Sequence, residues 1–173
     1  PISVAGHLTP ELLDAFIAHG ADINAQDVAG MTALMHIIST AEYRENNRRF
    51  PLLKLLEAFK KHGADINIRD FQNNTALMYA VEKEDELFFD ILKIFKEDIK
   101  PETVKCQNDD EDTMTSIALF QDIETGFGEF DKEYANKRSK YRFMVKLTDF
   151  FVNLGFSVED IQGCSRKEFA ERI

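Results

Sequence analysis

The chain has 173 residues, of which 44% are hydrophobic and 30% charged, and its formal net charge at pH 7 is −10. This length suits one domain of ordinary size with a sizeable buried core. The acidic balance argues against binding to nucleic acid or to an anionic membrane, because phosphate recognition needs clustered Lys and Arg.

The first predicted element is an amphipathic helix over residues 12–20 (LLDAFIAHG), whose apolar residues recur at helical spacing. Gly20 lies just past the apolar run, where a residue with left-handed backbone ends a helix. Asn24 braces the turn that follows. Gly30 then provides the positive φ that a tight turn needs, and Thr32 caps a second helix that begins TALM.

The same segments return further along the chain. Residues 55–63 read LLEAFKKHG, residues 62–70 read HGADINIRD, and residues 73–78 read NNTALM. Seven of the nine positions of HGADINIRD are identical to those of HGADINAQD at 19–27. Asn73 takes the place of the glycine in the tight turn, as the next most tolerant residue. The repeated unit is therefore a helix, a turn, a second helix and an extended turn.

The pattern D-x-x-G-x-T-A-L-M, followed by a second helix and G-A-D-I-N, resembles the ankyrin repeat. The resemblance implies an all-α solenoid of about four irregular helix-turn-helix units with long inter-helix insertions. Ala33 and Ala76 stand where this family usually has Pro, and Met35 and Met78 stand where it usually has His. The family's Thr–His hydrogen bond at the start of the inner helix is therefore predicted to be absent, with thioether packing in its place.

We expect a single ankyrin-repeat domain over residues 1–173. Its predicted parts are a partial first unit at 1–26, a second unit at 27–69, a third at 70–109, a degenerate fourth at 110–159 and a truncated cap at 160–173. The repeat from Asp27 to Asp70 is 43 residues long, whereas the ankyrin period is about 33 residues. The extra residues are assigned to an insertion at 41–50, and a larger insertion is assigned to 124–142.

The later units are predicted to be less regular. The third outer helix is expected over 88–99 (FFDILKIFKEDI), and the closing GADIN motif is replaced after it. In the fourth unit, Thr115 is predicted to cap the inner helix and Ile117 to take the buried Leu position. The fourth outer helix is expected over 141–154, ending at Gly155.

No pattern in the chain predicts catalysis, a metal site or a cofactor. His19 and His62 occupy the same repeat position in separate units, and no second ligand type repeats with them. Cys106 and Cys164 lack the neighbours of a nucleophile, and two cysteines make no disulfide framework, which favours a reducing, intracellular setting. No apolar run approaches the roughly 20 residues of a transmembrane helix.

The predicted function is that of a protein–protein interaction module, an adaptor or effector that binds through the concave surface of hairpins and inner helices. The partner is expected to be another protein with a basic surface, not nucleic acid or a membrane, and the chain is expected to be monomeric. Phe71 and Tyr79 occupy variable positions at which the fold has no evident need for an aromatic residue. The predicted partner-binding residues lie on the hairpins, the inner helices and the acidic stretches: Val28, Met31, His36, Phe71, Gln72, Asn74, Tyr79, Glu82, Asp110, Glu111, Asp112 and Met114.

Three alternatives stay open. TALM-type repeats with long insertions resemble those of secreted effectors from intracellular bacteria, which implies action in the cytoplasm of a host cell. The repeats would instead be the substrate-docking region of a larger enzyme if a catalytic domain lay outside this chain, which begins at Pro1 without Met. The irregular half at 97–173 would otherwise form a site of its own.

Overall fold

The structure is a computed structural model, and it describes residues 8–41, 49–81, 85–115, 117, 145–153 and 155. In this part of the chain the elements are helices joined by turns, with isolated β-bridges and no strand, so the predicted all-α class is confirmed. The chain divides into two compact units, Pro1–Ile99 and Lys100–Ile173.

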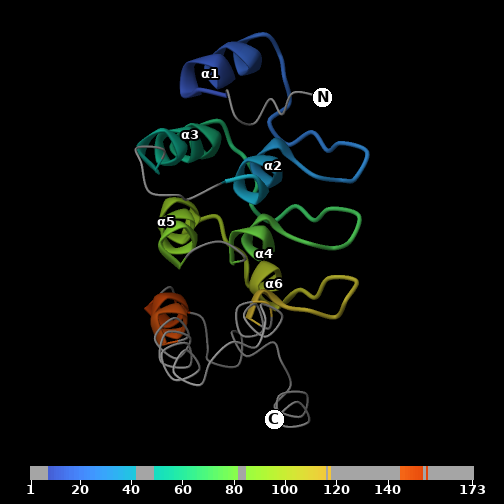
Figure 1. The fold of residues 1–173 in the computed structure, drawn as a ribbon, viewed down its shortest axis with the longest axis vertical. Coiled ribbons are helices and arrows are strands. Elements are labelled where there is room, and N and C mark those ends of the chain that lie inside the picture. The colour runs from blue at the N-terminus through green and yellow to red at the C-terminus, as the bar shows by residue number, and fades with distance from the viewer. Residues whose placement is uncertain are drawn as a thin grey trace, which may run out of the picture. The chain divides into compact units, whose positions relative to one another are not determined.

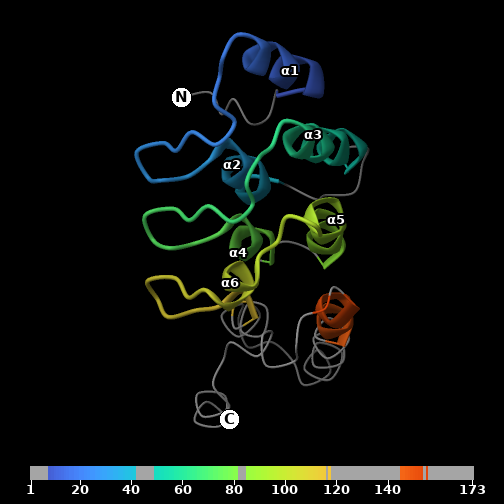
Figure 2. The same cartoon turned by 180° about the vertical axis from the view of Figure 1, so that it is seen from behind.

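The first unit is a stack of helix pairs. Its helices are α1 (Pro10–Ala18), α2 (Ala33–Ser39), α3 (Arg49–Lys61), α4 (Ala76–Val81) and α5 (Asp85–Phe95). Helices α1, α3 and α5 form an outer layer and α2 and α4 an inner layer, with neighbouring helices in contact within each layer (Figures 1 and 2). Two hairpin turns project from the inner layer on the side away from the outer helices. Each is closed by one antiparallel bridge, Gln26–Thr32 in the first and Arg69–Thr75 in the second.

The first two outer helices end at the predicted glycines, but α1 begins at Pro10, two residues before the predicted start at residue 12. Thr9 caps α1, because its hydroxyl accepts a hydrogen bond of 3.3 Å from the backbone N–H of Leu12. Gly20 and Gly63 follow the first two outer helices with φ of 87° and 79°, as the sequence predicts. Asn73 replaces Gly30 in the hairpin turn with φ of 62°. The chain thus turns at the same points in both repeats.

Methionine replaces the family's histidine at the start of the first inner helix in the predicted way. The Thr32 hydroxyl accepts from the backbone N–H of Met35 at 3.3 Å, and the Met35 sulfur accepts from the backbone N–H of Thr32 at 3.5 Å. The two residues form a reciprocal cap in which a thioether serves as the second acceptor.

The core lies between the two layers and between successive pairs. Leu13, Leu56 and Leu92 occupy the same position of their outer helices, and they are 4%, 0% and 0% exposed. The inner helices are nearly all buried, since Leu34 and Leu77 are 1% and 0% exposed. The three leucines therefore share one buried position of the repeated outer helix.

In the second unit the sequence-based register needs correction. The bridge that closes the hairpin joins Gln107 to Thr113, so Thr113 occupies the position of Thr32, two residues before the predicted Thr115. Ile117 is half-buried, nine residues after Asn108, and not at the buried Leu position. The error arose because T-x-T offers two capping hydroxyls, and helical spacing alone does not choose between them.

Other elements also differ from prediction. Helix α5 begins and ends earlier than the predicted 88–99, and a short helix, α6 (Pro101–Lys105), follows it. Proline at the first position of α6 is suited to a helix start. Residues 145–153 are helical, within the predicted outer helix at 141–154, and Gly155 follows them with φ of 88°. The insertion at 124–142 and most of that at 41–50 lie outside the described residues.

Candidate interaction surface

Each hairpin is built around one side chain at its start. In the first, the Asp27 Oδ1 oxygen accepts from the backbone N–H groups of Ala29 and Met31, both at 2.9 Å. Asp70 makes the same two bonds in the second hairpin at 2.9 and 2.8 Å, and Asn108 makes them in the third at 3.1 and 2.8 Å. A side-chain acceptor at this place satisfies N–H groups that the turn leaves without a backbone partner.

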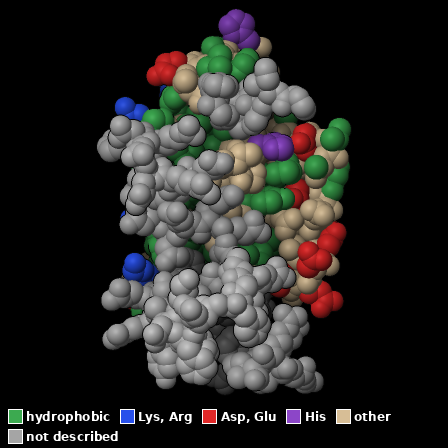
Figure 3. Space-filling model, viewed as in Figure 1, with side chains coloured by type: hydrophobic (Ala, Val, Ile, Leu, Met, Phe, Trp, Pro, Cys, Tyr) green, Lys and Arg blue, Asp and Glu red, His purple; other side chains and the backbone are tan. Residues whose placement is uncertain are grey.

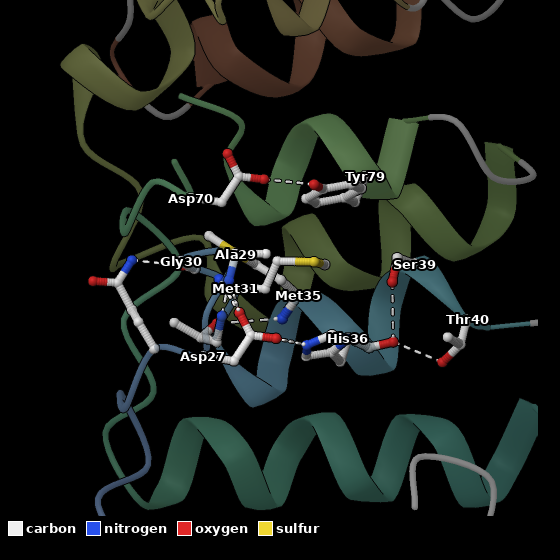
Figure 4. A network of polar contacts seen from close by, with 12 residues as sticks. Asp27, Ala29, Gly30, Met31, Met35, His36, Ser39, Thr40, Asp70 and Tyr79 are labelled. Atoms are coloured by element: carbon white, nitrogen blue, oxygen red, sulfur yellow. Dashed lines mark hydrogen bonds and ion pairs between the residues drawn. The ribbon is translucent and has the colours of Figure 1, made fainter. Parts of the chain in front are cut away.

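The second carboxylate oxygen of each aspartate receives a bond from the inner helix nine residues later (Figure 4). His36 Nε2 donates to Asp27 at 2.7 Å, and the Tyr79 hydroxyl donates to Asp70 at 2.5 Å. In the third hairpin the side chain of Asn108 is an amide, with nitrogen in place of the second carboxylate oxygen, and the corresponding helical residue is the apolar Ile117. A polar helical residue therefore stands opposite the hairpin residue in the two repeats where that residue is Asp, and an apolar one stands opposite Asn108.

The two acid pairs differ in their exposure to solvent. Asp70 is 5% exposed, whereas the side chains of Asp27 and His36 are 40% and 43% exposed. The hydrogen bond from His36, together with the backbone N–H groups of the turn, lowers the pKa of Asp27 from its usual value. The first pair is a polar feature of the surface, and Figure 3 shows a histidine beside an acidic side chain over α2.

Hydrogen bonds join the first hairpin to the second. Gln26 Nε2 donates to the carbonyl oxygen of Gly30 at 2.5 Å and to that of Arg69 at 2.8 Å. The backbone N–H of Phe71 donates to the carbonyl oxygen of Ala29 at 3.0 Å. These bonds hold the two hairpins side by side as one surface.

Asn24 and Asn67 link successive repeats near the base of the hairpins. The Asn24 amide donates to the carbonyl oxygen of Gly63 at 3.0 Å and accepts from the backbone N–H of Asp65 at 2.8 Å. Asn67 donates to the carbonyl oxygen of Asp98 at 2.8 Å. The role predicted for Asn24 in bracing its own turn thus extends to the next repeat, and Asn67 makes the equivalent link.

Two large apolar side chains are exposed on this surface. Val28 is 98% exposed and Phe71 is 69% exposed. The Phe71 ring lies close to Gly30, because a Cβ atom at Gly30 would come within 2.7 Å of its Cδ1 atom and within 2.6 Å of the Phe71 nitrogen. Glycine at this position therefore allows both the positive φ and the close approach of the aromatic residue.

A family model for ankyrin repeats, in three copies, matches residues 2–105. This chain belongs to the ankyrin-repeat family. Ankyrin repeats are in general protein–protein interaction modules, and they are typically non-catalytic. No curated protein matches this chain at a significant level.

The ankyrin hairpins carry most of the predicted partner-binding residues. Val28, Phe71 and Gln72 are exposed at the first two hairpins, while Met31 and Asn74 beside them are half-buried. His36 and Tyr79 lie on the ankyrin inner helices and bind the hairpin aspartates. Tyr79 has a structural role that the sequence did not indicate, because its hydroxyl satisfies a buried carboxylate.

The remaining predicted residues are not all on the surface. Met114 was expected to be exposed, which is wrong: it is fully buried, because Thr113 is the capping residue and Met114 starts the inner helix. Asp110 and Glu111 are exposed and Asp112 is half-buried on the hairpin of the second unit. Glu82 lies outside the described residues.

Sequence reasoning missed the residues that organise this surface. Asp27, Asp70 and Gln26 were not among the predicted binding residues, although they position the residues that were. The recurrence of an acidic residue nine positions before His36 and Tyr79 was the available signal.

Within the ranges that the structure describes, no group of three or more His, Cys, Asp and Glu side chains is placed to hold a metal ion. Over the same ranges, none of the helices has the length and apolar character needed to cross a membrane.

Proposed function

We propose that this ankyrin-repeat chain binds a protein partner through the first two hairpins and the adjoining face of α2 and α4. The observation that carries the proposal is Phe71, an aromatic residue 69% exposed whose backbone is fixed by a hydrogen bond to Ala29. Exposed aromatic residues of this kind are the usual anchors of protein interfaces. Val28, at the tip of the preceding hairpin, adds a second apolar contact.

The surface is held in one conformation before binding. The Asp27 and Asp70 turns, the Gln26 bridge and the pairing of Phe71 with Ala29 fix the hairpin backbones relative to one another. Binding then costs little conformational entropy in this part of the chain. Rigid presentation of Phe71 therefore favours a partner with a preformed apolar pocket.

The polar groups beside the apolar anchors indicate the chemistry of the partner. Asp27 is 40% exposed at its side chain, and the hydrogen bond from His36 lowers the pKa of its carboxyl group, so an acidic group lies beside the apolar anchors. The chain as a whole carries a net charge of −10. A partner that offers an apolar pocket rimmed by Lys or Arg would complement this surface, with the charges acting mainly on the association rate.

The test compares two exposed phenylalanines in different places. A partner is first obtained by affinity capture and purified, and its Kd is then measured by isothermal titration calorimetry for the wild type, Phe71→Ala and Phe16→Ala. Phe16 is 47% exposed on α1, away from the hairpins, and serves as the matched control. We expect Phe71→Ala to weaken binding at least ~30-fold, equivalent to about 2 kcal/mol, and Phe16→Ala to change it less than about twofold.

Unchanged binding by Phe71→Ala, with circular dichroism showing an intact fold, would exclude the hairpins as the working surface. The identity of the partner would also decide among the finer roles. A host-cell partner would support the predicted effector, and a partner that is chemically modified by the same polypeptide would support the docking region of a larger enzyme.

A further inference from the structure

Helix α1 exposes an apolar face that its counterparts in the stack bury. Leu12 is 40% exposed and Phe16 is 47% exposed, and His19 at the end of the helix is also exposed. Figure 3 shows hydrophobic side chains uncovered at the α1 end of this unit. These residues lie at i, i+4 and i+7, so they share one side of the helix.

The equivalent residues in the next two outer helices are buried. Leu55 and Phe59 of α3 are 4% and 0% exposed, and Ile91 and Phe95 of α5 are both 0% exposed. Helix α3 packs against α1, and α5 packs against α3 and α4, so in each case helices earlier in the chain contact the outer helix. Among the described residues, which begin at residue 8, no helix precedes α1.

Polar contacts between neighbouring outer helices also recur at equivalent positions. His62, at the end of α3, pairs with Asp14 of α1, and Lys61 adds a contact of 3.2 Å to the same carboxylate. Asp98, at the equivalent position after α5, pairs with Lys60 of α3 at 3.2 Å. The residue at this position therefore reaches back to the preceding outer helix. In α1 the position belongs to His19, whose Nδ1 instead lies 2.7 Å from the carbonyl oxygen of Ala15 in its own helix.

We propose that the face formed by Leu12, Phe16 and His19 docks a further ankyrin-type helix pair, supplied by the same polypeptide ahead of α1. Its outer helix carries a carboxylate at the position of Asp14, to pair with His19 as Asp14 pairs with His62. This occupant continues the packing already present between α1, α3 and α5. A second copy of the chain fits less well, because its Asp14 is already bound by His62 and Lys61.

The proposal is tested by supplying the missing helix pair from the chain itself. Residues 8–41 contain an outer helix, a hairpin and an inner helix, so a duplicate placed ahead of Pro1 puts a complete helix pair before α1. We expect the extended chain to unfold in one urea transition with a midpoint raised by at least about 0.5 M over the original chain, because each interface in a solenoid stabilises its neighbours.

Substitutions in the original α1 separate docking from a general effect of added length. Phe16→Asp should remove most of the increase in the urea midpoint of the extended chain. Val28→Asp is the control, because Val28 is 98% exposed on the hairpin of the original repeat, and it should leave that increase unchanged. An unchanged midpoint, or a gain that survives Phe16→Asp, would overturn the proposal.

Two further measurements test the source of the occupant. The gene should encode a helical segment ahead of the Pro1 codon, and a start codon immediately before Pro1 would overturn the proposal. Sedimentation equilibrium of the original chain should show a monomer. Self-association that Phe16→Asp abolishes would assign this face to a second copy instead. Neither the gene sequence nor the sedimentation measurement depends on partner binding at Phe71. This inference and the proposed function can therefore fail separately.

Discussion

The hydrogen bond between Tyr79 and Asp70 allows a sharp test of how the hairpins are stabilised. Asp70 is 5% exposed, and its Oδ1 oxygen accepts two backbone bonds of the second hairpin. Its Oδ2 oxygen accepts from the Tyr79 hydroxyl at 2.5 Å and from the Asn74 amide at 3.3 Å. Tyr79→Phe removes the shorter of these bonds and keeps the ring, so the substitution leaves a buried carboxylate oxygen with a poorer donor.

The expected loss in free energy of unfolding for Tyr79→Phe follows from the type of hydrogen bond that is removed. A hydrogen bond to a charged group contributes about 1.5–3 kcal/mol net, and the half-buried position of Tyr79 places this one near the lower end, at about 1.5–2 kcal/mol. For a chain of this length such a loss lowers Tm by about 3–8 °C if the chain unfolds in one transition. Urea denaturation followed by circular dichroism measures the free energy, and hydrogen exchange at Gln72 and Asn74 reports on the turn itself.

The first repeat provides a matched control. His36→Phe removes the equivalent bond to Asp27, but both side chains there are about 40% exposed, so water can replace the donor and the loss should be clearly smaller. Equal effects of the two substitutions, or a change below about 0.3 kcal/mol for Tyr79→Phe, would refute the reasoning that burial of Asp70 makes the bond important.

Three other predictions concern the stack and its turns. Leu56→Ala should cost about 2–5 kcal/mol in urea unfolding, because Leu56 is 0% exposed and its loss leaves a cavity; a change under roughly 0.5 kcal/mol would mean that the residue is not central. Gly30→Ala should destabilise the chain by about 1–3 kcal/mol more than Gly20→Ala, since both have positive φ but only Gly30 lies against Phe71; equal losses would contradict the close approach. Asp27→Asn should keep the turn, as Asn108 does, but lose the pairing with His36. Because the folded pKa of Asp27 is lowered, this contribution is present above about pH 4 and disappears as the pH falls further, so wild type and variant should converge in stability at low pH.

Several features of the candidate surface could be predicted from the sequence, because they depend on local chemistry. Exposure of Val28 and Phe71 follows from their place in a hairpin whose ends are marked by Asp and Thr. The exposure of Met114 could not be predicted correctly, because a shift of two residues moves this side chain from the surface to the core. The bridge between Gln107 and Thr113 and the two backbone bonds to Asn108 decide between the two registers.

The sequence by itself determined the repeat, the helix boundaries that Gly20, Thr32 and Gly63 mark in the first unit, and the buried register of Leu13, Leu56 and Leu92. These features depend on interactions within a few residues or on helical periodicity, both of which the amino-acid order specifies directly. The tertiary structure decided which residues of different repeats meet. Gln26 reaches Arg69, Tyr79 satisfies Asp70, and Leu12 and Phe16 stay exposed while their equivalents are covered. Such contacts depend on the stacking of one repeat on another, and similar local sequences acquire different environments according to their neighbours in the stack.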